Sequence, residues 1–338
     1  MKAEDLGEVW DRLRLAPAAE AGAALLSSAL MCALFGVVIG FAVAVARRRF
    51  GAGKPVGWVG DEERALAGAA LAVGAVWFVD LMVRGYVLNL SATTAWWQFA
   101  IAPVTAGVSL FLFALALRTP RTRARVTPGA VARRTWRSYG PTGPVMGAFG
   151  ALIVGAGAVT VACGAASTQS AAGSPERIAL GIPNTDLDPL VVLFPGWAYG
   201  LPLLVALGAL TLATILALHR NAVRPFRDGD SLDDERARRR RLSTGVVAVA
   251  SAGVLLGLAG LLRMARSAAA GSMTVRGDGL QSMTYAISSP YGELLVLGGV
   301  VASVMHIAAC AALTVMVVDA AWAQWRPVRR PAPAGALG

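Results

Sequence analysis

Long apolar stretches alternate with short polar segments along the chain, and this alternation predicts the fold. A stretch of about 18 or more apolar residues is long enough to cross the roughly 30 Å hydrocarbon core of a bilayer. Because a soluble chain would have to bury every one of these stretches as a helix without a polar face, we expect an all-α integral membrane protein with seven transmembrane helices. The predicted spans are Ala21–Ala46, Ala65–Val83, Phe99–Leu117, Val145–Ala166, Trp197–Leu218, Thr244–Leu262 and Leu294–Trp322.

Lysine and arginine are concentrated in every second gap between the apolar stretches. The gaps on one side of the predicted membrane, together with the C-terminal tail, hold 23 basic residues, whereas the other side holds 8. Since cytoplasmic loops carry such an excess, we expect an outside N-terminus and a cytoplasmic C-terminus. The predicted inner loops are 47–64, 118–144 and 219–243, and the predicted outer loops are 84–98, 167–196 and 263–293.

The chain is predicted to form one transmembrane domain, 21–325, with a short segment on either side. Residues 1–20 carry apolar and charged residues at helical spacing, which predicts an amphipathic helix on the outer face. Residues 326–338 are expected to form a flexible cytoplasmic tail. The first apolar stretch is not expected to be a removable signal peptide, because Arg47, Arg48 and Arg49 follow it directly.

The strongly basic composition is explained by the predicted membrane without nucleic acid. The net charge is +11, and the basic residues flank the spans, where they meet anionic lipid head groups. Arginine outnumbers lysine 29 to 2 and alanine and glycine are abundant, which is typical of a GC-rich bacterial genome. We therefore expect a multi-pass protein of a bacterial plasma membrane.

Acidic residues precede two of the spans and predict helix starts below the membrane. Asp61-Glu62-Glu63 precedes the second span and Asp233-Asp234-Glu235 the sixth, and acidic side chains favour the positive end of the helix dipole. Arg238–Arg241 are expected to extend toward the inner surface. The segment 118–144, with its seven arginines and four prolines, is expected to be a loop with at most a short helix.

The two longer outer loops contain turn signals and short apolar runs, for example Leu190–Phe194 and Met283–Ile287. Loops of this length are often functional or folded over the helices. Together with the N-terminal helix, they are expected to form a small external cap.

Asp80 is the clearest ionisable residue inside a predicted span, where such groups are costly and often functional. Arg84 follows one helical turn later on the same face, so the two side chains are placed to form an ion pair. Two interpretations stay open: a proton or cation site that opens to the outside, and an interfacial ion pair that anchors the helix.

His306 is the only histidine deep inside a predicted span, since His219 lies at the inner end of the fifth span. The different depths of the two imidazoles argue against bis-histidine haem ligation. Asp319 lies at the inner end of the seventh span, opposite to Asp80, which argues against an aspartyl intramembrane protease. His306 is interpreted as a packed or helix-bridging residue, or as part of a binding site in a transporter.

Arg263 and Arg266 end the sixth span on the outer side, where basic residues are otherwise scarce. With Arg84 they are placed to form an external positive patch for an anionic ligand, or to pair with acidic residues of the outer loops. Gly36 and Gly40, Gly253 and Gly257, and the glycines of the fourth span are expected to let helices approach closely within the bundle.

The sequence contains no phosphate-cradling glycine loop, zinc motif or nucleotide-binding signature. Its three cysteines fall in predicted spans without metal spacing, so no metal, cofactor or catalytic residue is assigned. The leading hypothesis is a non-enzymatic transport component or permease-like subunit. The alternatives are a structural or sensory subunit that binds a partner protein, and an enzyme at the outer face with His306 as its general base. Anionic lipid, a protein partner or a second copy of the chain are the expected partners.

Overall fold

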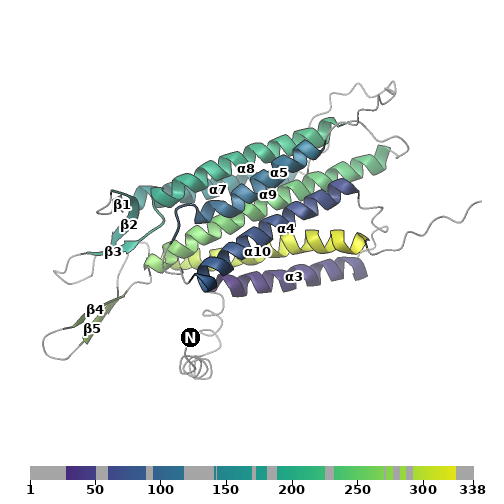
Figure 1. Ribbon diagram of the computed structural model, residues 1–338. Helices are drawn as coiled ribbons and strands as arrows, with labels where there is room; N and C mark the ends of the chain where they lie inside the picture. Colours follow the sequence, from purple (N-terminus) through teal and green to yellow (C-terminus); the bar gives the residue numbers. More distant parts are fainter. Residues whose placement is uncertain are drawn as a thin grey trace, which may run out of the picture.

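Seven helices, each long and apolar enough to cross a membrane, form one bundle (Figure 1), as the sequence predicts. The computed structural model describes residues 28–50, 60–88, 94–117, 141, 143–169, 173–180, 189–224, 232–269, 272–276, 282–286 and 292–324. The helices are α3 (Ala29–Phe50), α4 (Asp61–Met82), α5 (Ile101–Ala116), α7 (Gly143–Ala166), α8 (Trp197–Val223), α9 (Leu232–Ala269) and α10 (Gly292–Gln324).

Several predictions fall on parts of the chain outside the described residues. The expected amphipathic helix at 1–20, the cytoplasmic tail at 326–338 and nearly all of the inner loop at 118–144 are among them. The start of the first predicted span also lies there, because the description of that helix begins at Ala29.

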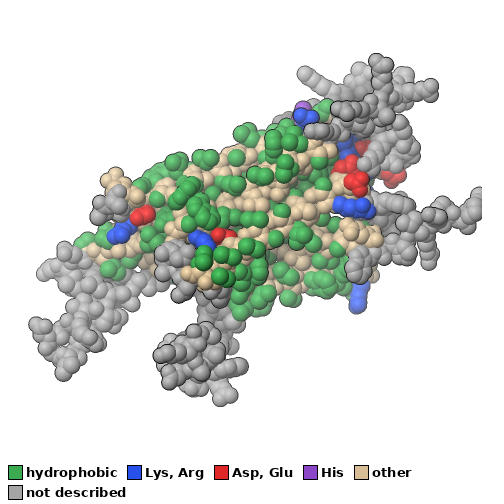
Figure 2. All heavy atoms as spheres, in the orientation of Figure 1, with side chains coloured by type: hydrophobic (Ala, Val, Ile, Leu, Met, Phe, Trp, Pro, Cys, Tyr) green, Lys and Arg blue, Asp and Glu red, His purple; other side chains and the backbone are tan. Residues whose placement is uncertain are grey.

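Helix α9 lies at the centre of the bundle. It packs against α4, α5, α7, α8 and α10, and residues such as Val246 and Leu256 are buried along it. Helix α3 lies at one edge, against α10 (Figure 1). On the face drawn in Figure 2, hydrophobic side chains cover the length of the bundle and most charged ones gather toward its ends. This distribution suits helices whose outward sides contact acyl chains.

The bundle has two ends of different character. At the end that we call the charged end, α3, α8 and α10 finish and α4 and α9 begin. At the opposite end, which we call the strand end, short strands connect α7 to α8 and α9 to α10 (Figure 1). The described helix ends that flank the predicted inner loops therefore lie at the charged end, and those that flank the predicted outer loops lie at the strand end.

Both acidic segments begin helices, as predicted. Helix α4 starts at Asp61, and the Glu63 carboxylate accepts a hydrogen bond from the backbone N–H of Gly60 at 3.2 Å. The first turn of α9 contains Asp233, Asp234 and Glu235. At 38 residues and 1.5 Å per residue, α9 is longer than the thickness of a bilayer core.

The expectation of an all-α chain is wrong at the strand end, where the structure contains two small antiparallel sheets. Short apolar runs flanked by turns satisfy their backbone groups by pairing with one another; in β2, Ile178 and Leu180 point to the buried side. One sheet joins β1 (Thr168–Gln169), β2 (Pro175–Leu180) and β3 (Leu190–Leu193), and the other joins β4 (Ser272–Arg276) to β5 (Ser282–Ala286).

Two predicted outer loops are also shorter than expected, because helices continue into them. Helix α9 runs to Ala269, so Arg263 and Arg266 lie on a helix and not in a loop. After α4 the chain forms a π-helical turn, η1 (Val83–Val87), and a 3-10 turn, η2 (Gln98–Ala100), precedes α5.

Close helix packing at glycines is confirmed at two of the three predicted places. An added Cβ at Gly36 would lie 2.6 Å from Cys310 Cβ of α10, and one at Gly257 would lie 2.6 Å from the backbone oxygen of Phe99. The prediction is wrong for α7. An added Cβ at Gly147, Gly150, Gly155 or Gly157 would meet no described atom within 4 Å, because these glycines face away from the bundle.

Candidate ligand-binding site

A polar cavity of about 290 Å³ lies between the helices near the strand end. Asp80 of α4, Arg263 of α9 and His306 of α10 all line it, together with Gln98 at the start of η2. The sequence singled out the first three residues separately, and the fold brings them to one place. A cluster of this kind at a helix interface is a typical location for a binding site.

Arg263 joins three helices at this cavity. Its Nε donates a hydrogen bond to Nδ1 of His306 at 3.2 Å, and its Nη2 lies 3.4 Å from Ser303 Oγ, so α9 is tied to α10. The same Nη2 lies 3.0 Å from Cys32 Sγ of α3. The guanidinium is thereby fixed in position while it faces the cavity.

His306 Nδ1 lies between a donor and an acceptor. It is 3.2 Å from Nε of Arg263, which can only donate, and 3.2 Å from the backbone oxygen of Ala302, which can only accept. The Nε2–H tautomer accepts from Arg263, and the Nδ1–H tautomer donates to Ala302. The ring is 2% exposed, and its centroid lies 5.4 Å from that of Trp77.

Gln98 also lines this cavity. Its Oε1 is buried and accepts no hydrogen bond from the described residues. Buried amide oxygens in folded proteins nearly always have a donor, so this oxygen is an exception in the wall of the cavity.

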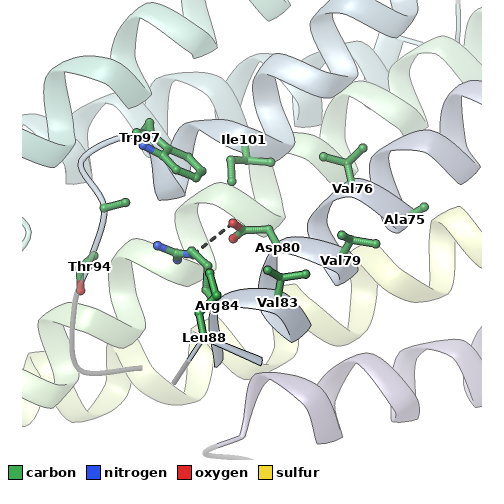
Figure 3. Close-up of a pocket in the computed structure, with 11 residues that line it drawn as sticks. Ala75, Val76, Val79, Asp80, Val83, Arg84, Leu88, Thr94, Trp97 and Ile101 are labelled. Atoms are coloured by element: carbon green, nitrogen blue, oxygen red, sulfur yellow. Dashed lines mark ion pairs between the residues drawn. The ribbon is translucent and has the colours of Figure 1, made fainter. Parts of the chain in front are cut away.

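Asp80 and Arg84 form the ion pair that their spacing predicts. Nε of Arg84 lies 3.1 Å from Oδ1 of Asp80, and the side chains are 13% and 17% exposed, respectively. The π-helical turn carries Arg84, whose guanidinium carbon lies 5.6 Å from the centroid of the Trp97 ring. Figure 3 shows the pair between α4 and the segment that carries Trp97.

The ion pair borders a second hollow, which we call the groove. It has a volume of about 920 Å³ and is lined mainly by apolar side chains of α4 and α5, among them Val76, Val79 and Ile101 (Figure 3). Asp80 and Thr94 line both the groove and the polar cavity. The two hollows therefore adjoin at these residues.

At the charged end, five ionised side chains form a network between α4, α8 and α9. Arg224 donates hydrogen bonds to Glu62 at 3.0 Å and to Glu235 at 3.1 Å, and Arg238 contacts the other oxygen of Glu62. Burial lowers the pKa of Arg224 from its usual value, and Glu235 and Glu62 act in the opposite direction.

Arg239 completes this network and closes the end of α8. Its Nε donates to Glu235 at 2.9 Å, and its Nη1 and Nη2 donate to the backbone oxygens of Ala222 at 2.9 Å and Arg224 at 2.8 Å. Arg239 is 0% exposed, so the expectation that Arg238–Arg241 all extend toward the inner surface is wrong here. Its role is to cap the last carbonyls of α8.

Asp319 lies at the charged end, as predicted, and faces α3. Its Oδ1 is 4.0 Å from Nε of Arg48, with the side chains 45% and 31% exposed, respectively. The Arg48 guanidinium also lies 4.3 Å from the centroid of the Trp322 ring. This contact is a surface anchor between α3 and α10, at the opposite end from Asp80.

The predicted positive patch of Arg84, Arg263 and Arg266 is divided by the structure. Arg263 lines the polar cavity and Arg84 lines the groove. Arg266 lies one turn beyond Arg263, against Gly299 of α10, where an added Cβ would meet its side chain. Sequence reasoning missed Trp77 and Gln98; only the i, i+3 spacing of Trp77 and Asp80 was available as a signal.

Seven long apolar helices in the described residues indicate a multi-pass membrane protein, and the cavity and the groove give it a candidate binding site near one end of the bundle. Within the described residues, no three His, Cys, Asp or Glu side chains are grouped to hold a metal ion. Comparisons of the chain with protein-family models, curated proteins and solved structures found no match.

Proposed function

We propose that this chain is a transport component of a bacterial plasma membrane and that it binds a small solute in the polar cavity. The observation that carries the proposal is the convergence of Asp80, Arg263 and His306, from three helices, on one cavity. Ionisable residues that face a cavity inside a membrane bundle commonly mark a solute or ion pathway.

The proposed orientation places the strand end outside the cell and the charged end in the cytoplasm. The unequal distribution of basic residues between the two sides supports it. The basic inner loops then contact anionic lipid head groups of the inner leaflet.

Labelling of introduced cysteines tests the orientation. In a background with the three native cysteines replaced by alanine, Gln169→Cys reports the strand end and Arg240→Cys the charged end; both positions are exposed. A membrane-impermeant thiol reagent applied to intact cells is expected to label only Gln169→Cys. Labelling of only Arg240→Cys would invert the proposed orientation.

A cysteine in the cavity tests the transport role without a known substrate. Gln98→Cys is made in the same background and exposed to a small, charged methanethiosulfonate reagent in right-side-out or inverted vesicles. A transport component alternates access to its site, so we expect reaction from both sides. Reaction from the outside alone would favour a binding or sensory subunit, and reaction from neither side would contradict a solute site.

The second candidate function, a subunit that assembles through its helices, is favoured by the outward glycines of α7. Gly147, Gly150 and Gly157 leave open space along this helix, and small residues permit close helix association in membranes. Under mild oxidation, Gly150→Cys would then form a disulfide-linked dimer. Gly208→Cys on α8, which also borders open space, is the matched control and would remain monomeric.

A further inference from the structure

We infer that the groove and the polar cavity form one site for an amphiphile with an anionic head group and a single acyl chain. The inference rests on the proposed solute site and names its ligand class: the chain lies in the groove and the head group enters the cavity. The observation that links them is that Asp80 and Thr94 line both hollows.

The lining of the groove suits an acyl chain. Val76 and Val79 of α4 and Val83 of η1 are 43%, 55% and 38% exposed, and Ile101 lies opposite them on α5 (Figure 3). In a bilayer this surface faces the hydrocarbon, from which a chain enters without crossing water. Its volume of about 920 Å³ is at the upper end of the range for ligand pockets.

The polar cavity suits the head group. Arg263 presents a guanidinium, which matches the geometry of a phosphate or carboxylate, and it is held in place by its contacts to His306 and Ser303. Gln98 lines the same cavity and adds a polar side chain to its wall. At about 290 Å³, the cavity has room for a head group but not for a chain.

The net charge of the side chains where the groove meets the polar cavity allows an anionic head group to pass. The Asp80 carboxylate, by itself, would repel an anionic head group that passes it. Arg84 lies 3.1 Å from that carboxylate and offsets its charge. The Trp97 ring beside Arg84 lines the groove there, where an indole is suited to the boundary between a polar head and an apolar chain.

Thermal unfolding of the purified full-length protein in a neutral maltoside detergent tests the inference with three probes. Oleoyl lysophosphatidic acid has both the chain and the anionic head, monooleoylglycerol has the same chain without charge, and inorganic phosphate has the charge without a chain. We expect lysophosphatidic acid to raise the Tm by several degrees and to exceed both other probes.

Two pairs of variants show where the probe binds. Arg263→Gln removes the head-group contact, and Val79→Trp fills the groove. Each is expected to weaken the apparent affinity for lysophosphatidic acid about tenfold or more. The matched controls are Arg266→Gln, on the same helix but in neither hollow, and Leu212→Trp, on an exposed apolar position of α8. Both are expected to bind as the unaltered protein does.

The outcomes separate this inference from the proposed function. Equal stabilisation by phosphate and lysophosphatidic acid, lost in Arg263→Gln, would overturn the amphiphile and leave a small-solute site. Equal stabilisation by monooleoylglycerol, or binding unaffected by Arg263→Gln and Val79→Trp, would identify lysophosphatidic acid as bulk lipid and overturn the inference. No stabilisation by any probe would also overturn it, while the reactivity of Gln98→Cys tests the solute site independently.

Discussion

The two ends of the bundle both bury arginines, but they use them differently. At the charged end, Arg239 is 0% exposed and its contacts are a carboxylate and two helix-terminal carbonyls. At the strand end, Arg263 contacts a histidine, a serine and a cysteine while it lines a cavity. The Arg239 guanidinium joins two helix ends by hydrogen bonds, whereas the Arg263 guanidinium lines the polar cavity.

The difference shows that burial of a charge is not, by itself, a sign of a binding site. A buried ion pair is costly to break from one side, although it adds little net stability over apolar packing. The network of Glu62, Arg224, Glu235 and Arg239 therefore fixes how α4, α8 and α9 meet. A charged group at a cavity retains the capacity to bind another molecule, and this distinction carries the functional assignment.

The largest effect on stability is expected from Arg239→Ala. The substitution leaves Glu235 without one of its guanidinium partners and exposes the α8 carbonyls, so we expect the free energy of unfolding to fall by about 3–5 kcal/mol. The measurement is SDS titration in mixed micelles followed by tryptophan fluorescence. The neighbouring, exposed Arg240→Ala is the control and should change little; equal losses in both variants would refute a structural role for the network.

Arg263→Gln is expected to weaken ligand binding strongly while it lowers the free energy of unfolding only a little. Its contacts to His306, Cys32 and Ser303 are hydrogen bonds, so we expect a cost of about 1–2 kcal/mol. Binding of lysophosphatidic acid, in contrast, should weaken about tenfold or more. A stability loss as large as that of Arg239→Ala would remove the contrast between the two ends.

Arg84→Gln is expected to weaken binding without touching the polar cavity. The Asp80 carboxylate would then face the head group without its neighbouring guanidinium, and we expect a loss of affinity of about three- to tenfold for the anionic probe. Arg84→Lys keeps the charge and should retain most of the affinity. An equal loss in both variants would show that shape, and not charge, matters at this position.

The smallest effect is expected from Arg48→Gln, which breaks the exposed contact with Asp319. Pairs of this exposure contribute about 0–1 kcal/mol, so the unfolding curve should nearly overlay that of the unaltered protein. A loss of several kcal/mol would show that this exposed pair stabilises the protein as much as the buried network does, and would contradict the distinction between exposed and buried pairs at the charged end.

Apolar length and charge spacing were sufficient to predict part of this architecture. The seven helices, the acidic starts of α4 and α9, and the proximity of Asp80 and Arg84 all follow from local rules of length, dipole and helical period. The convergence of Asp80, Arg263 and His306 did not follow from any of them, because it depends on how α4, α9 and α10 turn toward one another.

Burial and strand formation were the features that the sequence did not indicate. Arg239 is one of four consecutive arginines, and only the position of α8 decides which of them is buried. The glycines of α7, like those of α3, lie in a predicted span, but they face away from the bundle, since helix rotation is set by neighbouring contacts. The strands β1–β5 have at most six residues, and the long apolar runs on which the prediction of spans rests give no signal for them.

The central claim is that the strand end binds a ligand while the charged end holds the helices together. It is tested most directly by measuring lysophosphatidic acid affinity and the free energy of unfolding on the same two variants, Arg263→Gln and Glu62→Gln. We predict that Arg263→Gln loses about tenfold or more in affinity at modest cost in stability. Glu62→Gln should bind within about twofold of the unaltered protein but unfold more readily. Normal binding by Arg263→Gln, or loss of binding by a folded Glu62→Gln protein, would contradict the account.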